Sequence, residues 1–98
     1  MKEFLQTKQS DLLEIINTFN GEFSSHDFIE IFSKRFEADY INFLVKYKNS
    51  GEAFKIVHSQ IGLYLSNNMS IFSIEKTHRK GSENVHGNVD NIQWWIKK

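Results

Sequence analysis

The chain has 98 residues, and its twelve basic residues balance its twelve acidic ones. This length fits one domain, and a hydrophobic content of 40% with nine Phe supplies enough apolar material for a core, so we expect a single folded domain over residues 1–98. The absence of cysteine excludes disulfides, thiolate nucleophiles and cysteine-ligated metals, and the lack of a long apolar run or an apolar N-terminus argues against a membrane span or signal peptide and for a cytoplasmic location.

The first predicted helix covers residues 3–19. Its apolar residues recur at helical spacing: Leu5, Leu12, Ile15, Ile16 and Phe19. Gly21 follows and can adopt the left-handed backbone of a C-cap. Glu22 and Phe23 then form a short extended link.

The second predicted helix covers residues 24–35 and begins with a capping signal. Ser24 and Asp27 stand three residues apart, which is an acidic variant of the capping box. A third helix is predicted over residues 37–47. The spacing leaves open whether residues 24–47 form one helix or two, and the dense apolar content after Phe36 favours two.

The fourth predicted helix covers residues 52–67, after the break at residues 48–51. An apolar stripe runs along it at a period near 3.6: Ala53, Val57, Ile61, Tyr64 and Leu65. Lys55 and Ser59 fall on the opposite side. Gly62 in mid-helix destabilises it by roughly 1 kcal/mol relative to Ala, so we expect a close approach of another helix or of a ligand at this position.

After Asn68 the pattern favours β structure. We expect a hairpin with strands over about 70–77 and 84–96, around a polar stretch over 75–91 that contains Gly81 and Gly87. Trp94 and Trp95 are adjacent and must point to opposite faces of a strand. One therefore enters the core, and the other is a candidate for an interface with a partner.

The segment 54–65 and the strand-loop-strand that follows it resemble a recognition helix and a wing. The chain is thus similar to the winged helix-turn-helix superfamily, through element order over most of its length. The resemblance implies an α+β, mostly helical fold with three to four helices followed by a C-terminal β-hairpin. The chain departs from the pattern by one additional helix before the presumed recognition helix.

The resemblance implies a DNA-binding domain, with helix 52–67 in the major groove and the 75–91 region as the wing. We expect a transcriptional regulator that acts as a homodimer on double-stranded DNA. The residues predicted to contact DNA are Lys55, His58, Ser59, Gln60, Arg79, Lys80, Asn84 and Lys97. An ordinary solvated helix face would account equally well for those on the helix.

The main alternative is a protein–protein interaction module on the same fold, which would use the hairpin with Trp94 and Trp95. The zero net charge favours this alternative, because dedicated DNA binders are often basic. The charge is mildly asymmetric: residues 1–49 carry a balance of −2 and residues 50–98 a balance of +2. A further alternative is an accessory piece of a larger protein.

Catalysis and metal binding find little support in the sequence. The run from Ser24 to Asp27 contains Ser, His and Asp, but a helix N-cap explains it, because a triad needs spatial convergence that adjacent residues do not give. The four His lack the spacing that places two ligands on one helical face. We therefore expect no enzyme activity, no cofactor and no metal.

Overall fold

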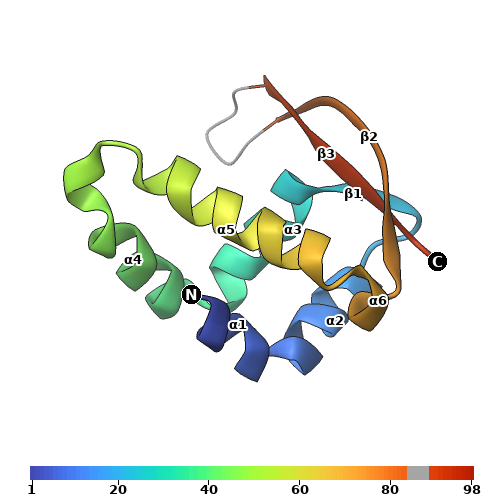
Figure 1. Ribbon diagram of the computed structural model, residues 1–98, viewed down its shortest axis with the longest axis horizontal. Helices are drawn as coiled ribbons and strands as arrows, with labels where there is room; N and C mark the ends of the chain where they lie inside the picture. Colours follow the sequence, from blue (N-terminus) through green and yellow to red (C-terminus); the bar gives the residue numbers. More distant parts are fainter. Residues whose placement is uncertain (84–88) are drawn as a thin grey trace.

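The computed structural model describes the backbone of residues 1–83 and 89–98, and the side chains of residues 1–77 and 92–98. The α-helices are α1 (Lys2–Thr7), α2 (Gln9–Asn17), α3 (Ser25–Arg35), α4 (Glu37–Lys46), α5 (Ala53–Asn67) and α6 (Met69–Phe72), with a 3₁₀ turn η1 (Lys48–Ser50). The strands are β1 (Glu22–Ser24), β2 (Ile74–Glu83) and β3 (Val89–Lys97). The described chain is therefore α+β and mostly helical, as expected from the sequence (Figure 1).

The three strands form one antiparallel sheet in the order β1-β3-β2. The extended link predicted at residues 22–23 is β1, and it pairs along the end of the chain, from Glu22 opposite Ile96 to Ser24 opposite Trp94. β2 pairs with the other edge of β3, with a register shift between Lys76 and Arg79. Because β3 lies in the middle, the chain's last strand is tied to both of the others.

The expected single helix over residues 3–19 is instead two helices that meet at Lys8. Lys8 leaves helical geometry, with φ −113° and ψ 18°, and its N–H donates to the carbonyl of Leu5 at 3.1 Å. The break lets α1 contact α5 while α2 contacts α3. Both Leu5 and Leu12 are buried as a result, which a helix continuing in one direction would not guarantee.

The start of α3 and its separation from α4 agree with the sequence. The Ser24 hydroxyl accepts from the Asp27 N–H at 3.0 Å, and the Asp27 carboxylate accepts from the Ser24 N–H at 2.9 Å, which completes the capping box. Phe36, with φ −118° and ψ 46°, ends α3 and precedes α4. The preferred alternative of two helices is confirmed, and the triad-like composition of this segment is a helix cap.

The prediction of a strand from about residue 70 is wrong for its first residues. Residues there form α6, whose last residue, Phe72, is fully buried, and Ser73 ends the helix in the left-handed region at φ 53°. The apolar run is too short for its period to separate helix from strand. β2 then extends to Glu83 through a polar segment predicted as loop, because backbone pairing with β3 does not require apolar alternation in the sequence.

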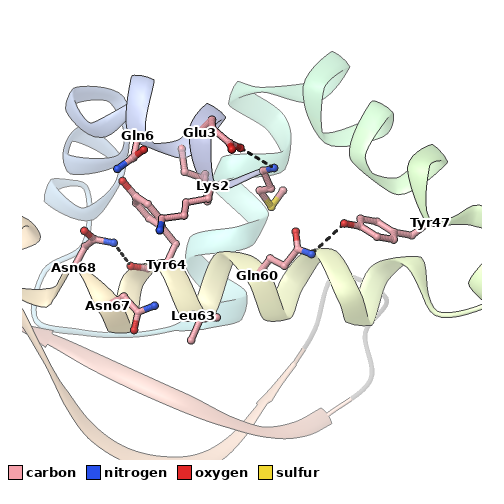
Figure 2. A pocket seen from close by; sticks show the side chains of 11 residues that line it. Lys2, Glu3, Gln6, Tyr47, Gln60, Leu63, Tyr64, Asn67 and Asn68 are labelled. Atoms are coloured by element: carbon pink, nitrogen blue, oxygen red, sulfur yellow. Dashed lines mark hydrogen bonds and ion pairs between the residues drawn. The ribbon is translucent and has the colours of Figure 1, made fainter.

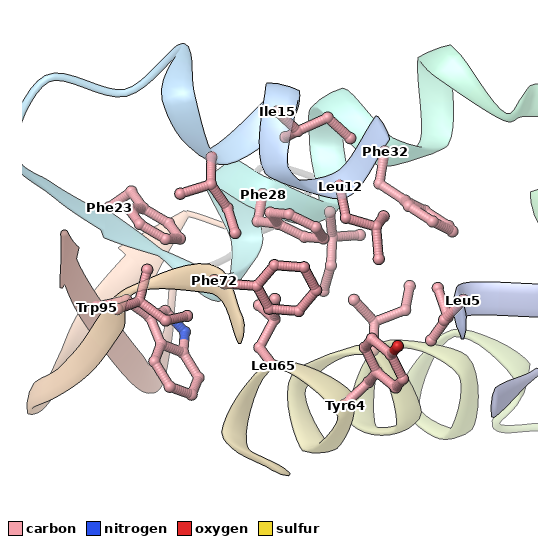
Figure 3. Packing of buried hydrophobic residues seen from close by; sticks show 14 of the residues in the cluster. Leu5, Leu12, Ile15, Phe23, Phe28, Phe32, Tyr64, Leu65, Phe72 and Trp95 are labelled. Carbon is pink, nitrogen blue, oxygen red and sulfur yellow. The ribbon is translucent and has the colours of Figure 1, made fainter. Parts of the chain in front are cut away.

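The core joins all the helices to the sheet (Figure 3). Its largest fully buried side chains include Trp95 from β3, Phe23 from β1, Phe28 and Phe32 from α3, and Phe72 from α6. The Trp95 indole N–H donates to the Ser25 hydroxyl at 2.9 Å, and that hydroxyl donates to the Gln93 carbonyl at 3.2 Å. The start of α3 is thus fastened to the central strand by hydrogen bonds as well as packing.

Outside the core, one ionic cluster links α2 to α3. The Arg35 guanidinium contacts the Asp11 carboxylate at 2.6 Å and also the Glu14 carboxylate. These hydrogen bonds, first that with Glu14 and then that with Asp11, raise the pKa of Arg35. Because the three side chains are well exposed, we assign the cluster a role in orientation and only a minor one in stability.

Candidate nucleic-acid interface

The outward face of α5 carries two of the residues predicted to contact DNA. Lys55 and Ser59 are exposed and lie one helical turn apart, and Leu63, one turn further, is 59% exposed. Gly62 and the partly exposed Ser66 lie on the same side of the helix. Lys55 has one carboxylate near it, that of Glu52 at 4.0 Å. This face is therefore narrow, weakly charged and made largely of small or aliphatic side chains.

Gly62 has no close neighbour within the described part of the molecule. A Cβ built at this position meets no atom within 4 Å. The expected approach of another helix is therefore not found among the described residues, and packing gives no reason for glycine here. The remaining expectation, a close approach by a bound partner, stays a prediction.

Gly62→Ala is expected to raise the free energy of unfolding by about 0.5–1 kcal/mol. Alanine has the higher helix propensity, and its methyl group would enter open space. Urea denaturation followed by circular dichroism at 222 nm measures the change. A loss of stability would contradict the open environment and would place a close neighbour over α5 in the free domain.

His58 and Gln60, also predicted to contact DNA, are turned toward α4. The His58 Nε2 lies 2.6 Å from the Tyr40 hydroxyl, and the two rings stack at 5.9 Å. The Gln60 amide donates to the Tyr47 hydroxyl at 3.1 Å. Burial raises the pKa of the Tyr40 hydroxyl. Both side chains therefore contact α4 and its C-terminal end, and they do not extend the outward face that carries Lys55 and Ser59.

The basic residues assigned to the hairpin are arranged differently from the expectation. Arg79 and Lys80 were expected in the loop, but their backbone lies in β2, opposite Gln93 and Ile92 of β3. Their side chains, and Asn84 entirely, lie outside the described residues. The sequence could not place this boundary, because nothing in the polar composition distinguishes loop from exposed strand.

Lys97 is not brought together with Lys55. Lys97 pairs with Ile74 at the start of β2, which follows the C-terminal end of α5, whereas Lys55 lies in the first turn of that helix. The two ends are well separated in Figure 1, where the chain terminus C lies beyond α6. Lys97 is half-buried and is therefore a weaker candidate for a phosphate contact.

The two adjacent tryptophans lie on opposite faces of β3, as predicted. Trp95 is 1% exposed and part of the core, so it is removed from the predicted interface. Trp94 is half-buried on the opposite face of β3 and remains the interface candidate of the pair. Which of the two is buried depends on the register of β3 against β1, and that register cannot be derived from two short segments far apart in the chain.

A groove that the sequence did not predict lies between α1 and α5 (Figure 2). It encloses about 600 Å³. Its lining residues are Met1, Lys2, Glu3, Leu5, Gln6, Tyr47, Gln60, Leu63, Tyr64, Asn67 and Asn68. Only tertiary contact brings these segments together, since no local motif connects them.

Comparisons with protein-family models, with curated proteins and with solved structures found no match. Among the residues that the structure describes, no cluster of three or more His, Asp or Glu is placed to hold a metal ion. Within the same residues, no helix has the length and apolar character needed to cross a membrane.

Proposed function

We propose that this chain is a winged-helix domain that binds double-stranded DNA, with the outward face of α5 in the major groove. The observation that carries the proposal is topological: α5 leads through α6 into a hairpin whose last strand is central in the sheet order β1-β3-β2. A strand from the N-terminal half pairs with the hairpin, and the outward face of the helix before it carries an exposed Lys and Ser.

The outward face of α5 has the chemistry to lie against base edges. Lys55 can donate to a phosphate or to a guanine, Ser59 can donate or accept, and Leu63 can contact a thymine methyl group. Gly62 and Ser66 leave room for the helix backbone to approach. Relative to the sequence-based expectation, His58 and Gln60 leave the contact set, and Leu63 and Ser66 enter it.

The additional helix is accommodated as an insertion between α3 and α5. α4 packs on the inner side of α5 through Tyr40 and Tyr47, so it leaves Lys55 and Ser59 exposed. α3 and α5 then correspond to the helix-turn-helix pair, with α4 and η1 in place of the turn. A regulator acting as a homodimer in the cytoplasm fits this function, since a second copy would double the contacts of one short helix.

The Lys55→Glu variant is expected to weaken binding to duplex DNA about tenfold, because it replaces a phosphate-attracting charge with a repelling one. Fluorescence anisotropy with a labelled duplex of mixed sequence at low salt measures the change.

The matched control is Lys34→Glu on α3. Lys34 and Lys55 are exposed to 76% and 77%, and each lies within 4.0 Å of a Glu one helical turn before it. Both variants change the net charge equally. Equal weakening by the two variants would show attraction to overall charge and would contradict a docking face on α5.

A protein-interaction function is the second candidate, and the exposed aliphatic residues favour it. Leu63 and Ile71 are 59% and 53% exposed, and Ile41 and Val45 on α4 are 48% and 52% exposed. Such side chains contribute to protein interfaces and little to phosphate contacts. An apolar interface would give association that is nearly independent of salt, whereas phosphate contacts give a steep dependence.

A further inference from the structure

The groove between α1 and α5 is lined by uncharged hydrogen-bonding groups. Four carboxamides and two phenols face it: Gln6, Gln60, Asn67, Asn68, Tyr47 and Tyr64. Figure 2 shows Gln6 reaching from α1 toward Tyr64 of α5, with Gln60 and Tyr47 further along the groove. The charged groups of the lining are Lys2 and Glu3, of opposite sign and both exposed, together with the terminal amine of Met1, which lies 4.0 Å from the Glu3 carboxylate.

Hydrogen bonds within the protein fix the orientation of several of these groups. The Gln60 amide nitrogen donates to the Tyr47 hydroxyl at 3.1 Å, and the Asn68 amide nitrogen donates to the Tyr64 carbonyl at 2.8 Å. The Gln9 amide donates to the Tyr64 hydroxyl at 3.0 Å. Gln60 and Asn68 are thereby left with a carbonyl oxygen that can accept, and each Tyr with a hydroxyl proton that can donate.

Gln6 and Asn67 supply a further pair of amides, one from each wall. Both side chains are exposed, and the described residues offer them no hydrogen-bond partner. A carboxamide presents a donor and an acceptor side by side, which is the complement of an amide edge in a ligand. Leu63 adds apolar surface to the groove, and the buried Leu5 lies beneath it.

We propose that this groove binds a neutral small molecule that carries an amide group, with an N–H to donate and a C=O to accept. The volume of about 600 Å³ is in the range of small-molecule sites. Lys2 and the terminal amine of Met1 are offset in part by Glu3, and the other polar groups of the lining are uncharged, so a neutral ligand is favoured. A pyrimidine nucleoside such as uridine carries the N–H beside the C=O on one edge of its base. An acetamido sugar carries the same two groups pointing in opposite directions, so it could pair with one amide from each wall. Both are of suitable size.

The site goes beyond DNA binding and does not depend on it. Gln60, Leu63 and Asn67 of the groove nevertheless lie on α5, next to the face proposed to enter DNA. A bound ligand would thus contact the proposed recognition helix directly. Its detection needs no DNA, so the two proposals can fail separately.

The test is a titration of the ¹⁵N-labelled full chain, followed by ¹H–¹⁵N correlation spectra. The probes are N-acetylglucosamine and uridine, with glucose as the analogue without an amide and uridine monophosphate as the charged analogue. We expect saturable shifts from at least one amide probe, confined to the backbone amides of α1, Tyr47 and residues 60–68. Millimolar dissociation constants are expected for ligands of this size. The stronger of the two amide probes identifies the ligand as sugar-like or nucleobase-like.

A variant pair completes the test. Asn67→Ala is expected to weaken binding of the amide probe at least about threefold, because the variant loses an amide that would pair with the ligand. Asn42 lies at an exposed position of α4 outside the groove, so Asn42→Ala is expected to leave the affinity unchanged. Absence of shifts with both amide probes overturns the proposal. Equal binding of glucose and N-acetylglucosamine overturns the amide requirement, and tighter binding of the monophosphate than of uridine overturns the neutral class.

Discussion

Trp95→Ala is expected to lower the free energy of unfolding by about 3–5 kcal/mol, which is a large fraction of the stability of a domain of this size. Trp95 is 1% exposed, lies on the central strand and pairs across to Phe23 of β1. Its loss would leave a cavity between the sheet and α3, and the hydrogen bond from its indole to Ser25 would also be lost. Urea titration of the purified variant, with circular dichroism as the signal, gives the value.

Two further variants separate packing from hydrogen bonding at this position. Trp95→Phe keeps most of the side-chain volume but loses the hydrogen bond to Ser25. Its free energy of unfolding is therefore expected to lie between those of the wild type and Trp95→Ala. Trp94→Ala is the matched control, because the neighbouring ring is only half-buried. If Trp94→Ala destabilised the domain more than Trp95→Ala, the assignment of faces to β3 would be wrong.

Phe32→Ala has the second largest expected effect, a decrease in the free energy of unfolding of about 3–5 kcal/mol. The fully buried Phe32 ring is the hub of an aromatic cluster, with centroids 5.3 to 6.5 Å from those of Phe4, Phe28, Phe36 and Tyr40. The cluster joins α1, α3 and α4, so removal of the Phe32 ring weakens the packing among all three helices. Thermal and urea unfolding monitored at 222 nm both report the change.

Leu63→Ala serves as the control for Phe32→Ala. Leu63 is 59% exposed, and truncation there is expected to change stability by less than about 0.5 kcal/mol. A similar loss in the two variants would contradict the burial difference between them. Leu63→Ala also tests binding, since the residue lies on the outward face of α5.

The sequence predicted α3, α4 and α5 well because their signals are local. Ser24 and Asp27 mark the start of α3, and the apolar stripe of α5 repeats over four turns. The sheet order could not be predicted in this way. Pairing of Glu22 with Ile96 joins residues 74 positions apart, and nothing in either short segment specifies the other. The helix at Met69–Phe72 was missed because four residues are too few to display a period.

Helical periodicity predicted only the part of the candidate site that lies opposite the buried stripe of α5. Lys55 and Ser59 are exposed because they lie opposite the buried stripe. His58 and Gln60 lie on the flanks of α5, where exposure depends on the position of α4, and spacing along one helix does not contain that information. The groove against α1 was not predicted for the same reason, since only the fold brings Gln6 and Asn67 to the lining of one groove.

The most direct test of DNA binding is the affinity of the unmodified chain for a mixed duplex, measured by fluorescence anisotropy over a series of salt concentrations. The winged-helix proposal predicts micromolar binding at low salt that weakens steeply, with a logarithmic slope of about −3 for three to four phosphate contacts. The Arg79→Ala/Lys80→Ala variant should reduce the magnitude of that slope by about two. Absence of binding at low salt, or binding that does not respond to salt, would contradict DNA recognition and would direct the search to a protein partner.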